Sequence, residues 1–564
     1  MSAIPLIVGV TGHRDLLNDE LDILKVSVRD FFNQVASAAP ELTLSLISPL
    51  AEGADQLVAE VAMEMNIPVT ALLPMPVDYY RQDFQGAALQ KFNELLAVCD
   101  VIELSLKSPG EAGSSLDEDT KEQQYVKMGA YLAAHSHILL ALWDGKDSHW
   151  PGGTSRVINF HQYDTMDPTK DGDYLSPINF TEDESDLVYH IRCSRRSNEQ
   201  SLSIDDSGTG IWSTRDSLEP KTKQIPARYL GVFRRMAEFN RDAAAIVPAI
   251  TGKGLIPTEL EAPFDSGIEL ISAQFVKADA LARHFQSRMF IAVRTGFVLI
   301  LLAGLCFIIY ADLFSNDMMI YGYLIFVLAI FIVFGFERIS GWKRKYLDYR
   351  VLAEALRVQF YWSLASVRSN RAHRFCHDSF HERRDLELGW IRNVMRYTGR
   401  SVDAHPHADK SKVDLVIKYW IGNDNEGQRN YYLSKASMST DRQRLTRALE
   451  IGAFSAVMLM TLILAFIKLH SDISDILIAL IGLLPFIVAV RQNYAFQTSE
   501  RELITQYSYY YRIFTNAQRL IEHGTNVEHR QHVLRALGEA ALDESSQWIL
   551  RQKERPISGT IVGA

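Results

Sequence analysis

Short apolar runs alternate with longer amphipathic stretches over the first part of the chain. Residues 20–39 place Leu24, Val28 and Phe32 at the spacing of one helix face. The apolar runs are of strand length and are apolar on both faces, which is typical of buried parallel strands. They lie at residues 5–10, 42–50, 67–75, 99–104 and 134–145. Because strands and helices alternate, the pattern predicts an α/β, Rossmann-like parallel sheet.

Four longer apolar segments follow in the second half, at residues 295–311, 318–336, 451–467 and 475–490. Each is about long enough to cross the hydrocarbon core of a bilayer. None contains a charged side chain except Asp475, at the edge of the last segment. Short polar loops join them in pairs. The sequence therefore predicts an all-α membrane domain with four transmembrane helices in two hairpins.

Basic side chains flank the outer ends of both hairpins, at Arg288, Arg294, Arg338, Lys343, Arg344, Arg442, Arg444, Arg447 and Arg491. The hairpin tips are acidic or nearly neutral, with Asp312, Asp317, Lys468, Asp472 and Asp475. By the positive-inside rule, both termini and the segment between the hairpins are expected in the cytoplasm. The N-terminus has no basic segment followed by a long apolar run, so no signal peptide is expected. These features predict a multi-pass protein of the cell inner membrane.

Length, charge and cysteine content narrow the possible functions. A chain of 564 residues is expected to form several domains. The net charge of -10 and the pI near 5.9 argue against a nucleic-acid partner. Cys99, Cys193, Cys306 and Cys376 show no CxxC spacing and no histidine in ligand register, so neither a metal site nor a disulfide scaffold is expected. The spans lack the ionisable residues of a pump or proton relay.

Glycines and polar residues gather where three of the predicted strands end. The first group is Gly9, Thr11, Gly12, His13 and Arg14, and the second is Gly53, Ala54, Asp55 and Gln56. The third is Trp143, Asp144, Gly145 and Lys146, followed by Gly152, Gly153 and Thr154. Parallel strands end at one edge of their sheet, where ligands bind in α/β folds. Glycines admit a phosphate, amides at a helix N-terminus and Arg14 can hold it, and Asp55 or Asp144 can bind ribose hydroxyls. A nucleotide-binding edge is the prediction.

Two resemblances extend this interpretation. TGHR (11–14), LAEGADQLVAE (50–60) and LLALWDGK with GGT (139–146 and 152–154) resemble the SLOG superfamily of nucleotide-binding, Rossmann-like domains. ADALARHFQSR (278–288), the first hairpin, YRVLAEALRVQFYW (349–362) and the WI, Q, YY and KA positions of 420–436 resemble the SLATT module, a two-transmembrane-helix effector of bacterial conflict systems. The second hairpin departs from the two-span SLATT pattern.

The resemblances imply the following domains: a SLOG-like domain at 1–165, a SLATT-like unit at 266–436, a second transmembrane hairpin with a cytoplasmic helix at 437–545, and a tail at 546–564. Residues 166–265 are rich in turn-forming and acidic residues and are expected to form a linker or structural insert, with one helix near 227–246. No chemistry is predicted there.

The function implied is a nucleotide-gated membrane effector of bacterial antiviral defence. A nucleotide second messenger or NAD-derived ligand binds the SLOG-like domain, and a homo-oligomer forms a pore in, or disrupts, the lipid bilayer. No cofactor and no catalytic residue are predicted. The alternative is a membrane-anchored nucleotide hydrolase, because some SLOG relatives are phosphoribohydrolases with a PGGxGTxxE motif. Here PGGTSRVINF (151–160) keeps PGG but lacks the GT step and the glutamate, which favours binding without turnover. Glu52 and His13 are the residues left as a possible base.

Overall fold

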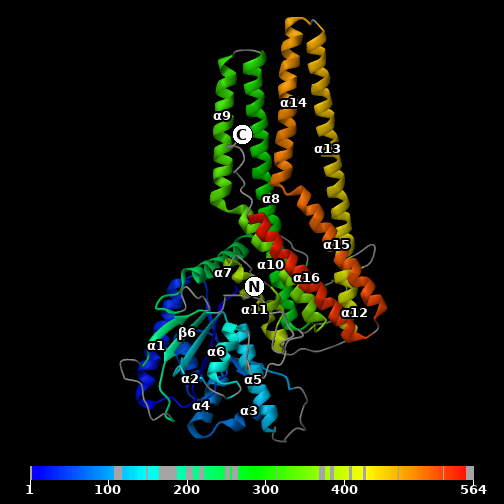
Figure 1. Cartoon of the computed structure of the whole chain (residues 1–564). Helices are drawn as coiled ribbons and strands as arrows, with labels where there is room; N and C mark the ends of the chain where they lie inside the picture. Colours follow the sequence, from blue (N-terminus) through cyan, green and yellow to red (C-terminus); the bar gives the residue numbers. More distant parts are fainter. Residues whose placement is uncertain are drawn as a thin grey trace. The chain divides into compact units, whose positions relative to one another are not determined.

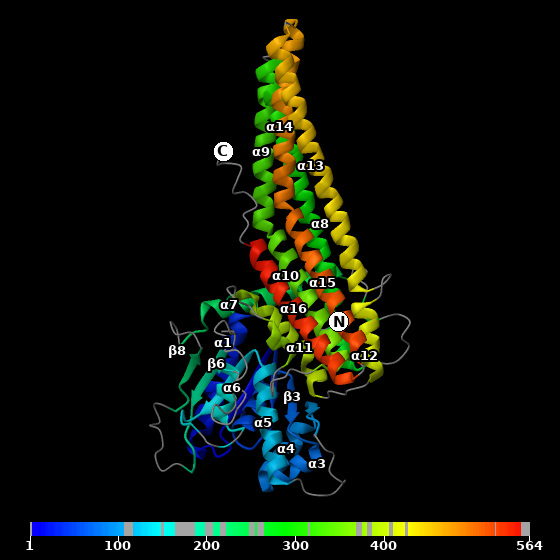
Figure 2. The same cartoon turned by 45° about the vertical axis from the view of Figure 1, so that its right-hand side comes forward.

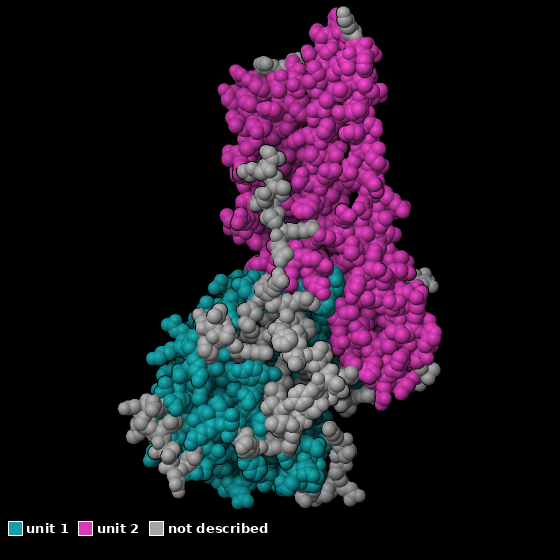
Figure 3. All heavy atoms as spheres, in the orientation of Figure 1, with its two compact units in different colours: residues 1–277, 352–409, 542–546 teal, residues 278–351, 410–541, 547–564 magenta. Residues whose placement is uncertain are grey.

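The computed structural model describes residues 3–106, 117–147, 150, 152–163, 187–197, 207–214, 221–247, 254–256, 264–313, 316–367, 375–380, 386–404, 410–422, 427–467, 469–524 and 526–553. The chain divides into two compact units (Figure 3). Unit 1 comprises residues 1–277, 352–409 and 542–546, and unit 2 comprises residues 278–351, 410–541 and 547–564. Pro151 of the expected PGG segment, residues 166–186, 198–206, 215–220, 248–253 and 257–263 of the expected linker, and residues 554–564 of the expected tail lie outside the described residues.

A sheet of eight strands forms the centre of unit 1 (Figure 1). The strands are β1 Leu6–Gly12, β2 Leu44–Ser48, β3 Val69–Leu73, β4 Asp100–Glu103, β5 Ile138–Trp143, β6 Leu187–Arg192, β7 Gly210–Ser213 and β8 Lys221–Thr222. Their spatial order is β4-β3-β2-β1-β5-β6-β7-β8, with parallel pairing from β4 to β6 and antiparallel pairing beyond. The predicted parallel α/β sheet is confirmed. β1, paired on both sides, lies inside the sheet and is buried along its apolar length.

Three of these strands lie in the segment that was expected to be a linker or insert. β6 is a short apolar run whose Val188 pairs with Leu139 of β5. β7 contributes Trp212, a fully buried side chain whose ring lies 5.7 Å from Phe31 and 4.7 Å from Tyr189, between centroids. The expectation of loops around residue 212 was therefore wrong. The strands are short and their neighbours polar, so tertiary packing rather than local pattern determines them.

Helices cover the sheet of unit 1 (Figure 2). They are α1 Leu21–Ala38, α2 Ala54–Glu64, α3 Val77–Tyr80, α4 Gly86–Leu96, α5 Glu118–His135, α6 Thr154–Tyr163 and α7 Ala227–Ile246. α1 packs against α2, and α5 against α6. Because right-handed crossovers move the chain outward from β1 to β4, α1, α2 and α4 lie on one face, and α5 returns the chain along the other face to β5. α7 matches the helix expected near 227–246.

A distant segment of the chain completes unit 1. Helix α11, Gly389–Ala404, packs against α5 and α7. Its buried Arg396 donates to the carbonyl oxygen of Ser136 at 3.2 Å, between α5 and β5. Nearly all of α11 up to Gly399 is buried. Residues 1–165 alone would therefore leave a large apolar surface of this unit without its cover.

Long helices form unit 2. Across the chain's helical half these are α8 Ser266–Ile308, the π-helical turn η4 Ile309–Leu313, α9 Asp317–Ser340, α10 Trp342–Leu364, α12 Lys410–Val416, the π-helical turn η7 Ile417–Ile421, α13 Gln428–Phe466, α14 Ser471–Gln497, α15 Glu500–His523 and α16 Val527–Lys553. Three of these helices, α8, α10 and α16, also have residues in unit 1. Four helical stretches among the described residues are long and apolar enough to cross a membrane. The four predicted apolar segments lie within them, apart from Ile467 at the end of the third. Their side chains are exposed in the isolated chain, as at Phe331 (68% exposed) and Phe454 (70%).

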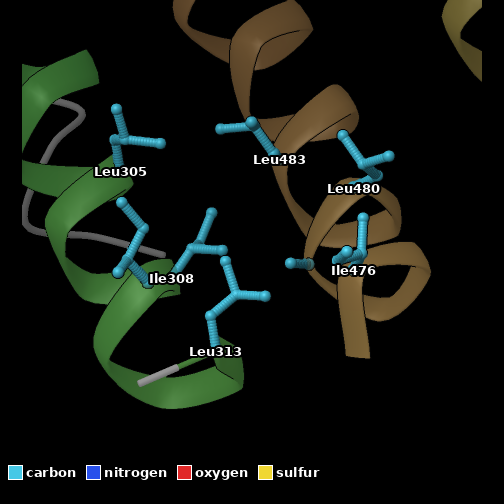
Figure 4. Close-up of a pocket in the computed structure, with 8 residues that line it drawn as sticks. Leu305, Ile308, Leu313, Ile476, Leu480 and Leu483 are labelled. Atoms are coloured by element: carbon cyan, nitrogen blue, oxygen red, sulfur yellow. The ribbon is translucent and has the colours of Figure 1, made fainter. Parts of the chain in front are cut away.

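Two glycines bring the apolar helices of unit 2 close together. A Cβ on Gly296 would lie 2.5 Å from the ring of Phe334, which joins α8 to α9. A Cβ on Gly304 would lie 2.2 Å from the ring of Phe486, which joins α8 to α14. One turn further on, η4 and α14 face each other across a small apolar pocket lined by Leu305, Ile308, Ile309, Leu313, Ile476, Ala479, Leu480 and Leu483 (Figure 4). The two hairpins are thus packed together through small and aliphatic side chains.

Candidate functional site at the carboxyl edge of the sheet

The end of β1 is held between its neighbours. Thr11 and Gly12 are the last residues of the strand and pair with Ala141 and Leu142 of β5. Beyond the strand, the backbone N–H of His13 donates to the carbonyl oxygen of Leu142 at 3.1 Å. The apolar side chains of β1 are buried in the sheet, and the first charged side chains follow where the strand ends. The His13–Arg14 turn therefore opens at the carboxyl edge of the sheet, as the sequence predicts.

Glycines let this turn touch the start of α2. Gly53 has φ +87°, and a Cβ there would lie 2.4 Å from the carbonyl oxygen of Arg14. A Cβ on Gly12 would lie 2.4 Å from the Cβ of Ala54. The N–H of Ala54 donates to the carbonyl oxygen of His13 at 3.1 Å, so one amide of the α2 N-terminus is used within the chain. Gly12 and Gly53 therefore allow the turn after β1 and the turn before α2 to pack directly against each other.

Arg14 and Asp55 form the centre of one half of the edge. Asp55 is buried, and its Oδ1 accepts no hydrogen bond from the described residues. Burial raises the pKa of the Asp55 carboxyl to about 8, although the nearby Arg14 guanidinium acts in the opposite direction. Asp55 is therefore mostly protonated at neutral pH and leaves the charge of Arg14 largely uncompensated. Arg14 itself is exposed.

Two tyrosines border Arg14. The guanidinium carbon lies 5.4 Å from the centroid of the Tyr125 ring, on α5, within cation–π range. The hydroxyl of Tyr125 donates to Asp83, which also pairs with Lys121 at 3.3 Å. Tyr80 of α3 is fully buried, and its hydroxyl donates to the carbonyl oxygen of Pro49 at 3.1 Å. The ring of Tyr125 thus supports a cation at the sheet edge.

His13 and Asp144 form the other half. The Nε2 of His13 lies 3.1 Å from both the carboxylate Oδ1 and the backbone nitrogen of Asp144. Burial lowers the pKa of His13 more than Asp144 raises it, so the ring is neutral at pH 7 and its Nε2 accepts the backbone N–H. The Oδ1 of Asp144 also accepts the N–H of Lys146 at 3.1 Å. His13 therefore links the turns after β1 and β5.

The third group of predicted residues lies in two places. Residues 143–146 lie in the half that contains His13 and Asp144, and residues 152–154 lie near the half that contains Arg14. Trp143 donates from Nε1 to the carbonyl oxygen of Lys146 at 2.9 Å, closing the exposed turn that contains Gly145. Gly152 has φ +73°, and a Cβ there would lie 3.0 Å from the backbone of Tyr125. Gly153 donates its N–H to the carbonyl oxygen of Trp150 at 3.0 Å, and the buried Thr154 begins α6. The glycine pair thus reaches the helix that supports Arg14.

Some predicted residues are structural. The side-chain amide of Gln56 donates to the carbonyl oxygens of Leu50 and Ala88, at 3.2 and 3.3 Å. Gly9 lies within β1, where a Cβ would lie 2.0 Å from the Oγ of Ser136. Glu52, the possible base, is exposed in its turn. Sequence reasoning missed Tyr80 and Tyr125, because neither lies at a strand end and no motif marks them.

No protein-family model and no curated protein matches this chain in sequence. The sheet edge and the apolar helices are therefore the features of the molecule that point to a function.

Proposed function

We propose that this chain is a nucleotide-responsive membrane effector. In this proposal a nucleotide or NAD-derived ligand binds at the carboxyl edge of the sheet, near Arg14, and the four apolar helices cross the inner membrane in two hairpins. The ligand favours an oligomeric arrangement that opens or disrupts the bilayer. One chain supplies too few helices to surround a pore, so the effector acts as a homo-oligomer. Antiviral defence is the setting implied by the SLOG and SLATT resemblances.

The proposal is carried by the exposed Arg14 guanidinium beside the buried Asp55 carboxyl, whose pKa burial raises to about 8. An arginine whose neighbouring carboxyl is neutral keeps its charge available for an anion, and guanidinium groups bind phosphate through two parallel hydrogen bonds. The rings of Tyr125 and Tyr80 border this position. In the same chain, apolar side chains such as Phe331 and Phe454 are exposed along helices of membrane-spanning length. Exposed apolar surface of this extent favours a lipid environment.

The alternative is a membrane-anchored nucleotide hydrolase. One observation favours it: a buried carboxyl with a pKa near 8 is suited to proton transfer at neutral pH, and Asp55 lies beside the proposed phosphate position. In this alternative the acid is Asp55 rather than Glu52, and the apolar helices serve as anchors.

The test uses the full chain in liposomes that contain a fluorescent dye, because unit 1 includes α11 and is incomplete without it. Nucleotides and NAD derivatives are added one at a time, dye release is followed, and the nucleotide is then analysed by mass spectrometry. Release with an intact nucleotide supports the effector. A cleaved nucleotide without release supports the hydrolase.

Arg14→Ala is the decisive variant. Loss of a charged hydrogen-bond donor costs about 1.5–3 kcal/mol, so we expect the ligand concentration needed for release to rise on the order of tenfold to a hundredfold. Arg29→Ala is the matched control, because Arg29 is an exposed arginine of α1 that pairs with Glu64 at 2.6 Å, outside the sheet edge. An equal response in wild type and Arg14→Ala would rule out the proposed position.

A further inference from the structure

A second cluster of titratable side chains lies in unit 1, outside the nucleotide site. His135 is the last residue of α5, His377 lies in the short helical turn Cys376–Ser379, and Asp403 is near the end of α11. One potential ligand atom from each lies within 4.8 Å of the other two. Both histidines are fully buried. Three segments that are distant in the sequence thus direct nitrogen and oxygen atoms to one point.

The tautomer of His135 leaves a lone pair directed into the cluster. Its Nδ1 lies 3.0 Å from the carbonyl oxygen of Arg396, which can only accept, so Nδ1 carries the proton. Nε2 is then unprotonated and lies 3.4 Å from Oδ2 of Asp403. This arrangement, in which a backbone carbonyl orients a histidine through its other nitrogen, is the usual second-shell support of a metal ligand.

The potential ligand atoms of the cluster make no hydrogen bond to any of the described residues. This holds for Nε2 of His135, Oδ2 of Asp403 and both ring nitrogens of His377, although Nε2 of His377 lies 3.4 Å from Oδ1 of Asp378. His137, two residues away, is different: its Nδ1 accepts the N–H of Ile7 at 3.0 Å and its Nε2 donates to Asn393 at 2.9 Å. A buried ring nitrogen that makes no hydrogen bond is costly, because it has lost its contact with water.

We propose that His135, His377 and Asp403 bind a divalent transition-metal ion. Two imidazole nitrogens and one carboxylate oxygen form a ligand set that suits zinc and its first-row neighbours. Tetrahedral bonds of about 2.0–2.1 Å place ligand atoms about 3.3 Å apart, close to the separation between His135 and Asp403. Asp378 is engaged by Arg392 at 3.0 Å, which leaves Asp403 as the carboxylate for the metal.

Such an ion would join the end of α5, the Cys376–Ser379 turn and the end of α11. The ring of Phe375 holds both imidazole rings in place. It stacks on His377 with centroids 5.6 Å apart, and its centroid lies 4.9 Å from that of His135. The ion therefore stabilises the packing of α11 on the sheet unit. This proposal is independent of the nucleotide site.

The experiment uses full-length protein in detergent, stripped with a chelator, reloaded with Zn²⁺ and separated from free metal. We expect one zinc per chain and a higher thermal midpoint than in the stripped protein. Asp403→Asn, which keeps the size of the side chain, and His377→Asn are expected to reduce zinc to background. His529→Gln, which removes an exposed histidine of α16, is expected to retain the full equivalent.

Co²⁺ provides a readout that does not depend on the variants. Reloading the wild-type chain with Co²⁺ is expected to produce the intense visible bands of a low-coordinate site, so the proposal is testable even where a variant fails to fold. Wild-type protein that retains no zinc and shows only the spectrum of hydrated Co²⁺ would overturn the proposal, as would a folded Asp403→Asn variant that keeps its zinc. The cluster would then be an acid–imidazole pair.

Discussion

At the scale of single residues, the carboxyl edge of the sheet combines close backbone contacts with one buried acid. Gly12 and Gly53 allow the turns after β1 and β2 to touch, and the carbonyl of His13 accepts an amide from the start of α2. That contact positions the backbone from which Arg14 extends. The position of the guanidinium therefore depends on residues that would not themselves touch a ligand.

Gly53→Ala is expected to disturb this contact strongly. A Cβ at Gly53 would lie within 2.4–2.7 Å of backbone atoms of His13 and Arg14, and φ is +87°. Gly145→Ala is the matched control: φ is +83° there as well, but nothing lies within 4 Å of the added Cβ. A left-handed backbone alone costs about 1–2 kcal/mol, so we expect Gly145→Ala to lose that amount and Gly53→Ala to lose clearly more. Thermal unfolding measures both, and equal losses would refute the contact.

Asp55→Asn is expected to weaken the pH dependence of stability. The folded pKa of about 8 exceeds the unfolded value near 3.8, so the unfolded chain releases this proton first as the pH rises. Stability contributed by this group is complete below pH 4 and is lost between pH 4 and 8, by up to about 1.4 kcal/mol per pH unit. The thermal midpoint should therefore fall less steeply in Asp55→Asn than in wild type. Asp22→Asn, which removes a carboxyl at an exposed site of α1, is the control substitution.

Sequence patterns predicted which turns lie at the carboxyl edge of the sheet, but not the helix residues that contact them. Arg14 and Asp55 follow apolar strands, and such positions are predictable because parallel strands end together. Tyr125 lies in the middle of α5, and its contact with Arg14 depends on how that helix crosses the sheet. The His135–His377–Asp403 cluster was beyond prediction for the same reason, since His135 precedes the other two by more than two hundred residues and the three show no ligand spacing.

At the scale of elements, long periodic segments and strands within clear apolar runs were predictable, whereas strands among polar, turn-forming residues were not. α15, Glu500–His523, coincides with a stretch recognised from its amphipathic pattern, and the five predicted strand regions all contain strands. β7 and β8 escaped recognition because their four and two residues lie among polar and turn-forming residues rather than in an apolar run. Helix contacts are also not readable from glycines alone. Gly296 and Gly304 lie against rings of neighbouring helices, whereas Gly452 and Gly482 have nothing within 4 Å of an added Cβ.

A disulfide can test the contact between α8 and α9. A Cβ on Gly322 of α9 would lie 3.4 Å from the Sγ of Cys306 on α8, which is near enough for a cysteine at position 322 to form a disulfide with Cys306. We expect Gly322→Cys to cross-link with Cys306 under mild oxidation, so that two thiols disappear and a cross-linked peptide is found by mass spectrometry. Gly335→Cys, with nothing within 4 Å, should keep its thiol. Equal oxidation of both variants would indicate that α8 and α9 do not pack as described.

At the scale of the whole molecule, the proposed function requires the four apolar helices to cross the membrane in one orientation. The charged residues that flank them are unequally distributed: Arg338 and Lys343 follow the second apolar segment and Arg442 and Arg444 precede the third, whereas Asp472 and Asp475 lie at a tip. Moving several cationic side chains across a bilayer is unfavourable, so the basic ends are expected to stay on the cytoplasmic side.

Cysteine accessibility tests this orientation in a chain whose four native cysteines are replaced by serine. Asp472→Cys introduces a thiol at an exposed position at the start of α14, and Ser437→Cys introduces one at an exposed position of α13, on the basic side of its apolar segment. We expect a membrane-impermeant maleimide to label Asp472→Cys in intact cells and Ser437→Cys only after permeabilisation. The reverse pattern would place the sheet unit outside the cytoplasm and remove it from cytoplasmic nucleotides. Labelling of both positions in intact cells would mean that α13 does not span the membrane, and the effector proposal would fail with it.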